Sequence, residues 1–195
     1  MSQQPPSGVP AERYQQAARQ IDQTASRATL RLTVISDSMR PLLRAGDVVV
    51  VQPQEPRTLQ VGQVIVVQRH GEWITHRLQA VDAAGWHTHG DNLRTRDAAV
   101  GAADIVGRVI AVERATEHGA RTIDLRTASW SSAGSRIAQV QRAQLGLLDQ
   151  TRRFHPRWLG ARTRIAIAAG LSWPFAGLTR FLIWLTVRQS KGQTW

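Results

Sequence analysis

The sequence predicts a mainly β fold, in which a compact antiparallel sheet or barrel is followed by a helical tail. From residue 30 onward, short runs rich in Val and Ile recur at close spacing, and turn residues separate them. The hydrophobic fraction of 42% is enough for a real core and excludes wholesale disorder. The length of 195 residues fits one domain with appendages better than two large domains.

The elements are expected in a simple order along the chain. Residues 1–10 are polar and proline-rich, and residues 11–28 are rich in Gln and Ala and predict a helix. Together they form an N-terminal extension, residues 1–29, in which we find no apolar run typical of a secretory signal. The sheet domain is assigned to residues 30–126. Its six expected strands are 30–35, 47–52, 63–69, 73–82, 85–90 and 105–114.

The tail, residues 127–195, has a different charge from the rest of the chain. Residues 125–195 carry 11 basic side chains and one acidic side chain, whereas residues 1–124 carry 14 basic and 13 acidic side chains. Such an excess of positive charge indicates contact with a polyanion, either a membrane surface or nucleic acid. A helix is expected near residues 135–150, where Ile, Val and Leu recur among polar residues.

An apolar segment, residues 165–187, ends the tail and contains one charge, Arg180, and one proline, Pro174. It is long enough to span a bilayer, but it could also lie in the membrane interface or pack on its own domain. Arginines and tryptophans flank the segment, so we favour a membrane surface over nucleic acid as the partner of the tail.

Three short blocks carry candidate chemistry: S-D-S-M-R-P at 36–41, T-H-R-L at 75–78, and H-G-D-N at 89–92. A serine in a turn needs a base to become a nucleophile. The one lysine, Lys191, lies near the C-terminus, so the base must be a histidine or a carboxylate. His76 is the natural candidate, because histidine titrates near neutrality. A carboxylate would then orient its imidazole, and Asp97 and Asp91 are the candidates.

In this order and spacing, the blocks resemble signal peptidase I. The similarity is closest to the archaeal and endoplasmic-reticulum branch, which has histidine where bacterial enzymes usually have the catalytic lysine. It covers about residues 33–112 and includes I-V-G-R-V at 105–109, which resembles the closing strand of that fold. The resemblance implies an antiparallel β-barrel-type catalytic domain, related to that of self-cleaving repressors, in a serine endopeptidase without a cofactor.

The resemblance also implies a role for each matching residue. Ser38 is the nucleophile, His76 is the general base, and Asp97 is the third member, with Asp91 as support or alternative. The expected substrates are leader or signal-like peptides, cleaved after small residues at the −1 and −3 positions and bound as an added β-strand. At the oxyanion and substrate-binding positions stand Ser36 and Met39.

Two features depart from that family. Asp37 stands where the branch usually has glycine, which adds a negative charge beside the nucleophile. The N-terminal membrane anchor of signal peptidases is also missing, so we expect a specialised, membrane-associated peptidase whose catalytic domain faces the cytoplasm. These departures keep an alternative open, a non-catalytic peptide-binding or membrane-docking module with the same fold. A regulator associated with nucleic acid is a third, less favoured hypothesis.

Two further histidines, His87 and His89, could face the same side of one strand. A pair of imidazoles can begin a metal site, but no third ligand converges with them in the sequence. We therefore expect no metal in this protein.

Overall fold

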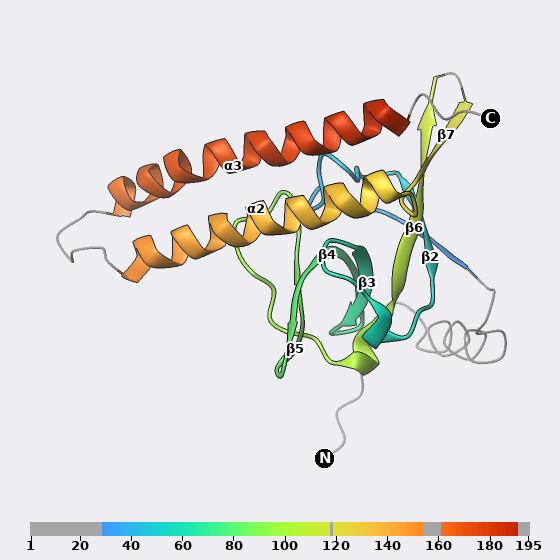
Figure 1. Cartoon of the computed structure of the whole chain (residues 1–195), viewed down its shortest axis with the longest axis horizontal. Helices are drawn as coiled ribbons and strands as arrows, with labels where there is room; N and C mark the ends of the chain where they lie inside the picture. The colour runs from blue at the N-terminus through green and yellow to red at the C-terminus, as the bar shows by residue number, and fades with distance from the viewer. Residues whose placement is uncertain (1–28, 118, 154–160, 191–195) are drawn as a thin grey trace, which may run out of the picture.

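The described part of the protein, a computed structural model of residues 29–117, 119–153 and 161–190, combines a β-sheet with two long helices (Figure 1). The strands are β1 (Leu30–Thr33), β2 (Val48–Gln52), β3 (Val64–Arg69), β4 (Glu72–Asp82), β5 (Gly85–His89), β6 (Ile105–Thr116) and β7 (Gly119–Asp124). The helices are η1 (Pro56–Thr58), η2 (Ala102–Asp104), α2 (Ala128–Arg153) and α3 (Ala161–Ser190). The helix expected over residues 11–28 lies outside the described residues.

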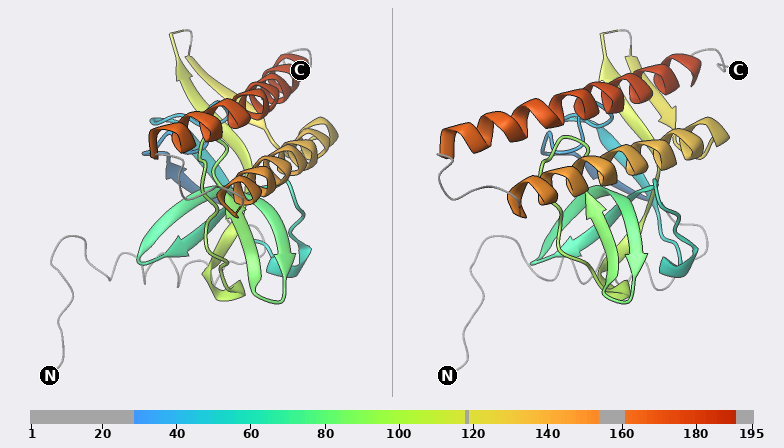
Figure 2. Two further views of the ribbon diagram at one scale, coloured as in Figure 1. Left: turned by 90° about the vertical axis from the view of Figure 1, so that its left-hand side faces the viewer. Right: turned by 60° about the vertical axis from the view of Figure 1, so that its left-hand side comes forward.

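The strands pair antiparallel throughout, as the sequence predicts. Their hydrogen-bonded order is β1-β2-β6-β3-β4-β5, and β7 pairs with β6 beside this path. Irregular register at Val50/Val51 and Val66/Val67 accompanies a strong twist of the sheet (Figure 2). Among the described strands no pairing joins β1 to β5, so the expected closure into a barrel is not shown.

The six expected strands agree with β1 to β6 to within two residues at each end. Two elements differ from the prediction. Strand β7 was not expected, because its sequence G-A-R-T-I-D offers a single buried apolar side chain, Ile123. Helix α2 begins at Ala128 rather than near residue 135, because Thr127 caps it. The carbonyl of Thr127 accepts the N–H of Ser131 at 3.0 Å, and its hydroxyl accepts the N–H of Trp130 at 3.4 Å.

Strand β3 explains how the core is divided. Its successive residues alternate between two apolar clusters: Val64 and Val66 face one, and Ile65 and Val67 face the other. Because both faces are buried, the strand reads as a continuous apolar run instead of an alternating one. The larger cluster also contains side chains from the loop between β1 and β2, from β2 and β6, and from α2 and α3, among them Met39, Leu42, Leu43, Val49, Val112, Trp130, Ile137 and Ile183.

Helix α2 packs on the sheet through two glycines. A Cβ atom built on Gly134 would lie 2.5 Å from the carbonyl oxygen of Gly62, and one built on Gly62 would lie 2.4 Å from the carbonyl carbon of Gly134. Gly62 also has a φ of 98°, which favours glycine. This close approach brings α2 beside β4 and so determines which of its side chains reach the site described below.

Helix α3 runs beside α2 in all three views (Figures 1 and 2). It contains the apolar segment 165–187 of the tail, and Pro174 lies inside it. Its C-terminal half packs on the domain, because Ile183 is buried in the larger cluster and Leu182 and Val187 contact that cluster. Among the residues that the structure describes, no helix has the length and apolar character that crossing a bilayer requires.

Candidate active site

Three segments that are distant in the sequence bring Ser38, His76 and Asp97 into contact. Ser38 lies in the turn after β1, His76 lies on β4, and Asp97 lies in the loop between β5 and η2. The Nε2 atom of His76 is 3.1 Å from the Ser38 hydroxyl oxygen, and its Nδ1 atom is 2.6 Å from Oδ2 of Asp97. His76 is 5% exposed, whereas Ser38 is half-buried and so remains accessible from solvent. Ser38 thus contacts His76, and His76 contacts one of the two candidate carboxylates, as expected from the sequence.

The environment of Asp97 determines which proton acceptor the site offers. Burial would raise the pKa of Asp97, but hydrogen bonds from His76 and Thr88 outweigh burial and hold that pKa below its usual value. The ionised carboxylate accepts the Thr88 hydroxyl at 2.7 Å and the Nδ1–H of His76. A histidine that carries its proton on Nδ1 has a free electron pair on Nε2, so the geometry suits Nε2 as the acceptor of the Ser38 proton.

The two residues expected at the oxyanion and substrate-binding positions have different surroundings. The hydroxyl oxygen of Ser36 is 3.2 Å from that of Ser38, and Ser36 is exposed. Its side chain can therefore reach an atom that reacts with Ser38. Met39, in contrast, is 1% exposed and belongs to the core, where its sulfur accepts the N–H of Asp91 at 3.4 Å. The Met39 side chain supports the loop from beneath.

Asp91 is placed away from the imidazole contact. Its carboxylate, fully buried, accepts Nε of Arg77 at 2.8 Å and Nη2 of Arg77 at 2.6 Å. Oδ1 also accepts the side-chain amide of Gln141, on α2, at 3.0 Å. The remaining Arg77 nitrogen, Nη1, donates to the carbonyl of Gly62 at 2.7 Å. Of the two carboxylates left open by the sequence, Asp97 contacts His76 and Asp91 forms a buried ion pair.

Three residues at the site were not singled out by sequence reasoning. Thr88 holds the carboxylate of Asp97, as described above. Asn92 donates its backbone N–H to the carbonyl of Ser38 at 2.8 Å and its side-chain amide to the carbonyl of Asp37 at 3.3 Å. Gly90 leaves room for the imidazole, since a Cβ there would lie 2.9 Å from Nε2 of His76. Asn92 and Gly90 were visible as part of the H-G-D-N turn, but their contacts depend on long-range packing.

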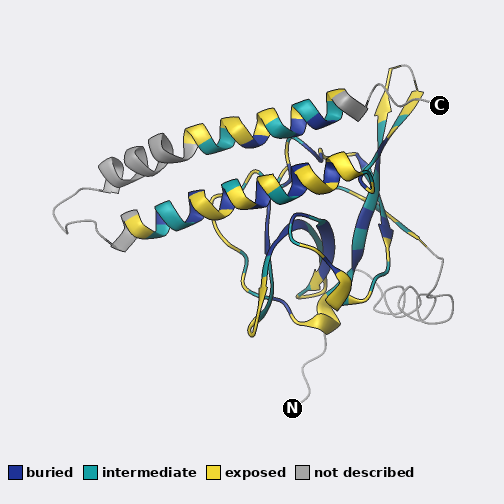
Figure 3. Ribbon diagram, in the orientation of Figure 1, coloured by how far each residue is buried: buried dark blue, intermediate teal, exposed yellow. Residues whose placement is uncertain are grey.

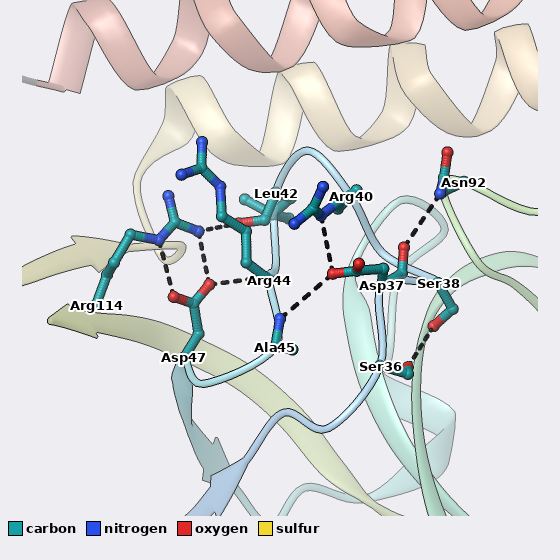
Figure 4. Close-up of polar contacts among 10 residues, drawn as sticks. All are labelled: Ser36, Asp37, Ser38, Arg40, Leu42, Arg44, Ala45, Asp47, Asn92 and Arg114. Carbon is teal, nitrogen blue, oxygen red and sulfur yellow. Dashed lines mark hydrogen bonds and ion pairs between the residues drawn. The ribbon is translucent and has the colours of Figure 1, made fainter.

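The extra charge of Asp37 is paired with an arginine of the same loop. Its Oδ1 atom is 2.8 Å from Nε of Arg40 and 3.5 Å from the backbone nitrogen of Ala45 (Figure 4). In the same loop, Asp47 accepts two hydrogen bonds from the guanidinium of Arg114 and a third from the backbone N–H of Arg44. Asp37 is therefore neutralised within its own loop.

His87 and His89, the two histidines considered as a metal-binding pair, contact different partners. Nε2 of His87 is 2.9 Å from the Asp82 carboxylate, and Nδ1 of His89 is 3.0 Å from the carbonyl of Thr95. Burial lowers the pKa of His89, which favours its uncharged form beside the site.

A serine, a histidine and an ionised aspartate in contact along one line can carry out nucleophilic acyl transfer. The comparison with protein families agrees with this class of chemistry. The profile of the Peptidase S24-like family matches residues 4–110, and the chain belongs to this family. The family includes serine peptidases and proteins that cleave their own chain. The match does not single out signal peptidase I, which the motifs resemble. A search of curated proteins found no match.

Proposed function

We propose that this protein is a serine endopeptidase that uses Ser38, His76 and Asp97. The observation that carries the proposal is the continuous line of contacts from the Ser38 hydroxyl through both imidazole nitrogens to the Asp97 carboxylate. Membership of the Peptidase S24-like family supports the class of reaction. Because the single lysine lies at residue 191, His76 takes the place of the lysine base in this account.

The reaction follows from the positions of the three side chains. Ser38 Oγ attacks the scissile carbonyl carbon while its proton moves to Nε2 of His76. The imidazolium that forms is stabilised by Asp97, and the developing oxyanion is within reach of the Ser36 hydroxyl. His76 then returns the proton to the leaving nitrogen, the C–N bond breaks, and an acyl ester on Ser38 remains. Water, deprotonated by His76, attacks this ester and releases the carboxylate product and the free serine.

The proposed substrates are leader or signal-like peptides with small residues at the −1 and −3 positions. The edge of the sheet beside Ser38 supports binding of an extended peptide. Val34 exchanges backbone hydrogen bonds of 2.8 Å with Asp47 and Gly46, so its polar groups face β2. Backbone groups alternate along a strand, so those of Thr33 and Ile35 face the edge of β1 that pairs with none of the described strands. An added strand there would end at the nucleophile.

The experiment that tests the proposal is a cleavage assay on peptides that carry Ala-x-Ala before the scissile bond. We expect the wild-type protein to cut after the second alanine and Ser38→Ala to leave the peptides intact. Ser132→Ala, which changes an exposed serine on α2, is the matched control and is expected to cut normally. Peptides with Phe in place of the second alanine are expected to resist cleavage.

The same assay separates the alternatives. If neither the peptides nor the protein's own chain is cut by a folded wild-type sample, the non-catalytic peptide-binding module is the better account. If the protein incubated by itself is cut and the peptides are not, the activity is limited to self-cleavage, and the proposed substrate class is wrong.

A further inference from the structure

Helix α3 presents an exposed aromatic stripe. Large exposed hydrophobic side chains of the described residues concentrate on this helix, where they are Trp173, Leu178, Phe181 and Trp184. Phe181, Trp184 and Arg188 follow one another at spacings of three and four residues, which place side chains on one face of a helix. Trp173 lies on the same face, about two turns before Phe181. The opposite face carries the buried residues Thr179, Ile183 and Thr186. Figure 3 shows exposed positions repeating along the coloured, C-terminal part of α3, with buried positions between them.

The side chains of this stripe are ordered relative to one another. The rings of Phe181 and Trp184 stack with their centroids 6.1 Å apart and their planes inclined by 27°. The guanidinium of Arg188 lies 5.2 Å above the Trp184 ring, within the range of a cation–π contact. Trp173 is 82% exposed. Aromatic rings next to a guanidinium are typical of surfaces that insert into the interfacial region of a bilayer.

A basic cavity lies beside the stripe. It has a volume of about 310 Å³ and is lined by Arg40, Pro41, Arg44 and Arg180. Arg40 faces Asp37, but among the described residues no carboxylate pairs with the side chains of Arg44 or Arg180. The cavity therefore carries three guanidinium groups and one neighbouring carboxylate. Figure 4 shows the guanidinium groups of Arg40 and Arg44 on the side of the loop that faces the helices.

We propose that this docking face, defined as Trp173, Phe181, Trp184 and the cavity arginines Arg40, Arg44 and Arg180, binds the surface of an anionic lipid bilayer. The arginine cavity would take the phosphate of a lipid headgroup, because guanidinium groups bind phosphate oxygens through paired hydrogen bonds. The aromatic stripe would enter the interface beside it. A nucleic acid would satisfy the arginines but leave the exposed apolar side chains in water, so the bilayer fits both halves of the face.

The docking face has a consequence for the active site. Arg40 follows Ser38 by two residues in the same loop, so binding through this face would hold the nucleophile at the membrane surface. Lipid binding itself does not rest on the proposed peptidase activity, and the two can be tested separately.

Co-sedimentation of the full chain with vesicles tests the proposal. We expect binding to phosphatidylcholine vesicles that contain phosphatidylglycerol, and little binding to phosphatidylcholine vesicles. The double variant Arg44→Gln/Arg180→Gln is expected to bind the anionic vesicles roughly 30-fold more weakly, which corresponds to about 1 kcal/mol for each arginine. Its matched control is Arg57→Gln/Arg136→Gln, which removes two exposed arginines outside the face and is expected to bind within about twofold of wild type.

A second pair of variants tests the aromatic stripe. Phe181→Gln/Trp184→Gln is expected to weaken binding at least tenfold, whereas Val81→Gln, at an exposed apolar position on β4, is expected to leave it unchanged. The proposal is overturned if wild type does not bind anionic vesicles, if both arginine pairs weaken binding equally, or if charged and uncharged vesicles bind alike. It is also overturned if a short DNA duplex binds through Arg44 and Arg180 while vesicles do not.

Discussion

Removal of the Asp91 carboxylate is predicted to destabilise the fold strongly, because it would leave a buried charge without its partner. Asp91→Ala deletes three accepted hydrogen bonds, two from Arg77 and one from Gln141. The Arg77 guanidinium would keep its bond to the Gly62 carbonyl but remain buried at 2% exposure. Breaking a buried pair by removing one partner costs about 4 kcal/mol, a large part of the stability of a typical domain.

The measurement is thermal unfolding of wild type and Asp91→Ala, followed by circular dichroism. For a chain of this length, about 4 kcal/mol corresponds to a fall in Tm of roughly 8–16 °C. Asp124→Ala is the matched control, because it also removes the acid of an Asp–Arg pair, but both partners there are substantially exposed. Such a surface pair contributes about 0–1 kcal/mol.

A double variant distinguishes destabilisation by the unpaired buried charge from destabilisation by lost packing. Replacing both partners, as Arg77→Met/Asp91→Leu, removes the stranded charge and is expected to be more stable than Asp91→Ala. The reasoning is refuted if Asp91→Ala loses no more stability than Asp124→Ala. That result would mean that the Arg77–Asp91 pair does not support the loop that carries the site.

Three further predictions concern the candidate site and the packing around it. Asp97→Asn is expected to lower kcat/KM in a peptide assay by about 10⁴. The amide of Asn can donate to Nδ1 of His76, which favours the tautomer with its proton on Nε2, and that tautomer cannot accept the Ser38 proton. A loss below tenfold would contradict this. Burial lowers the pKa of His89, so below about pH 6.5 the unfolded chain binds a proton at this histidine more readily than the folded protein does. The contribution of neutral His89 to stability is therefore complete above about pH 6.5 and is lost as the pH falls below that value. His89→Asn, compared with wild type by unfolding at pH 7 and pH 5, should therefore lose less stability on acidification; an equal loss would show that His89 is not the group responsible. Gly134→Ala would place its Cβ 2.5 Å from the Gly62 carbonyl oxygen and should cost about 1–3 kcal/mol in unfolding free energy. The control is Gly146→Ala on the same helix, where an added Cβ would meet no atom within 4 Å. Equal stability of the two variants would contradict the close contact.

The sheet was predictable because its strands contain β-branched runs between clear turns. Strands β1 to β6 follow this pattern closely. Strand β7 has no such run, and its pairing is supplied by the second half of β6, with which it forms a hairpin. The start of α2 was missed for a similar reason. Residues 128–134 contain three serines and one glycine, which are weaker helix formers than alanine, and burial of Trp130 against the core compensates.

The contact among Ser38, His76 and Asp97 was predictable from the order and spacing of the motifs. The separate placement of the two aspartates was not, because it depends on partners distant in the sequence. Asp91 is fixed by Arg77 and by Gln141, which reaches it from a helix 50 residues further along the chain. The burial of Met39 was also not apparent, since its neighbours Leu42 and Val112 come together only in the folded core. Motifs thus indicated the candidate chemistry, and packing determined which carboxylate contacts His76.

Trapping of the acyl-enzyme tests directly whether Ser38 is the nucleophile. Wild-type protein and an Ala-x-Ala peptide would be mixed, quenched in acid, and digested for mass spectrometry. We expect the acyl part of the peptide to be found on Ser38 in wild type and on no residue in Ser38→Ala. His76→Ala should form the adduct far more slowly. An adduct on another residue, or peptide cleavage that persists in Ser38→Ala, would contradict the account.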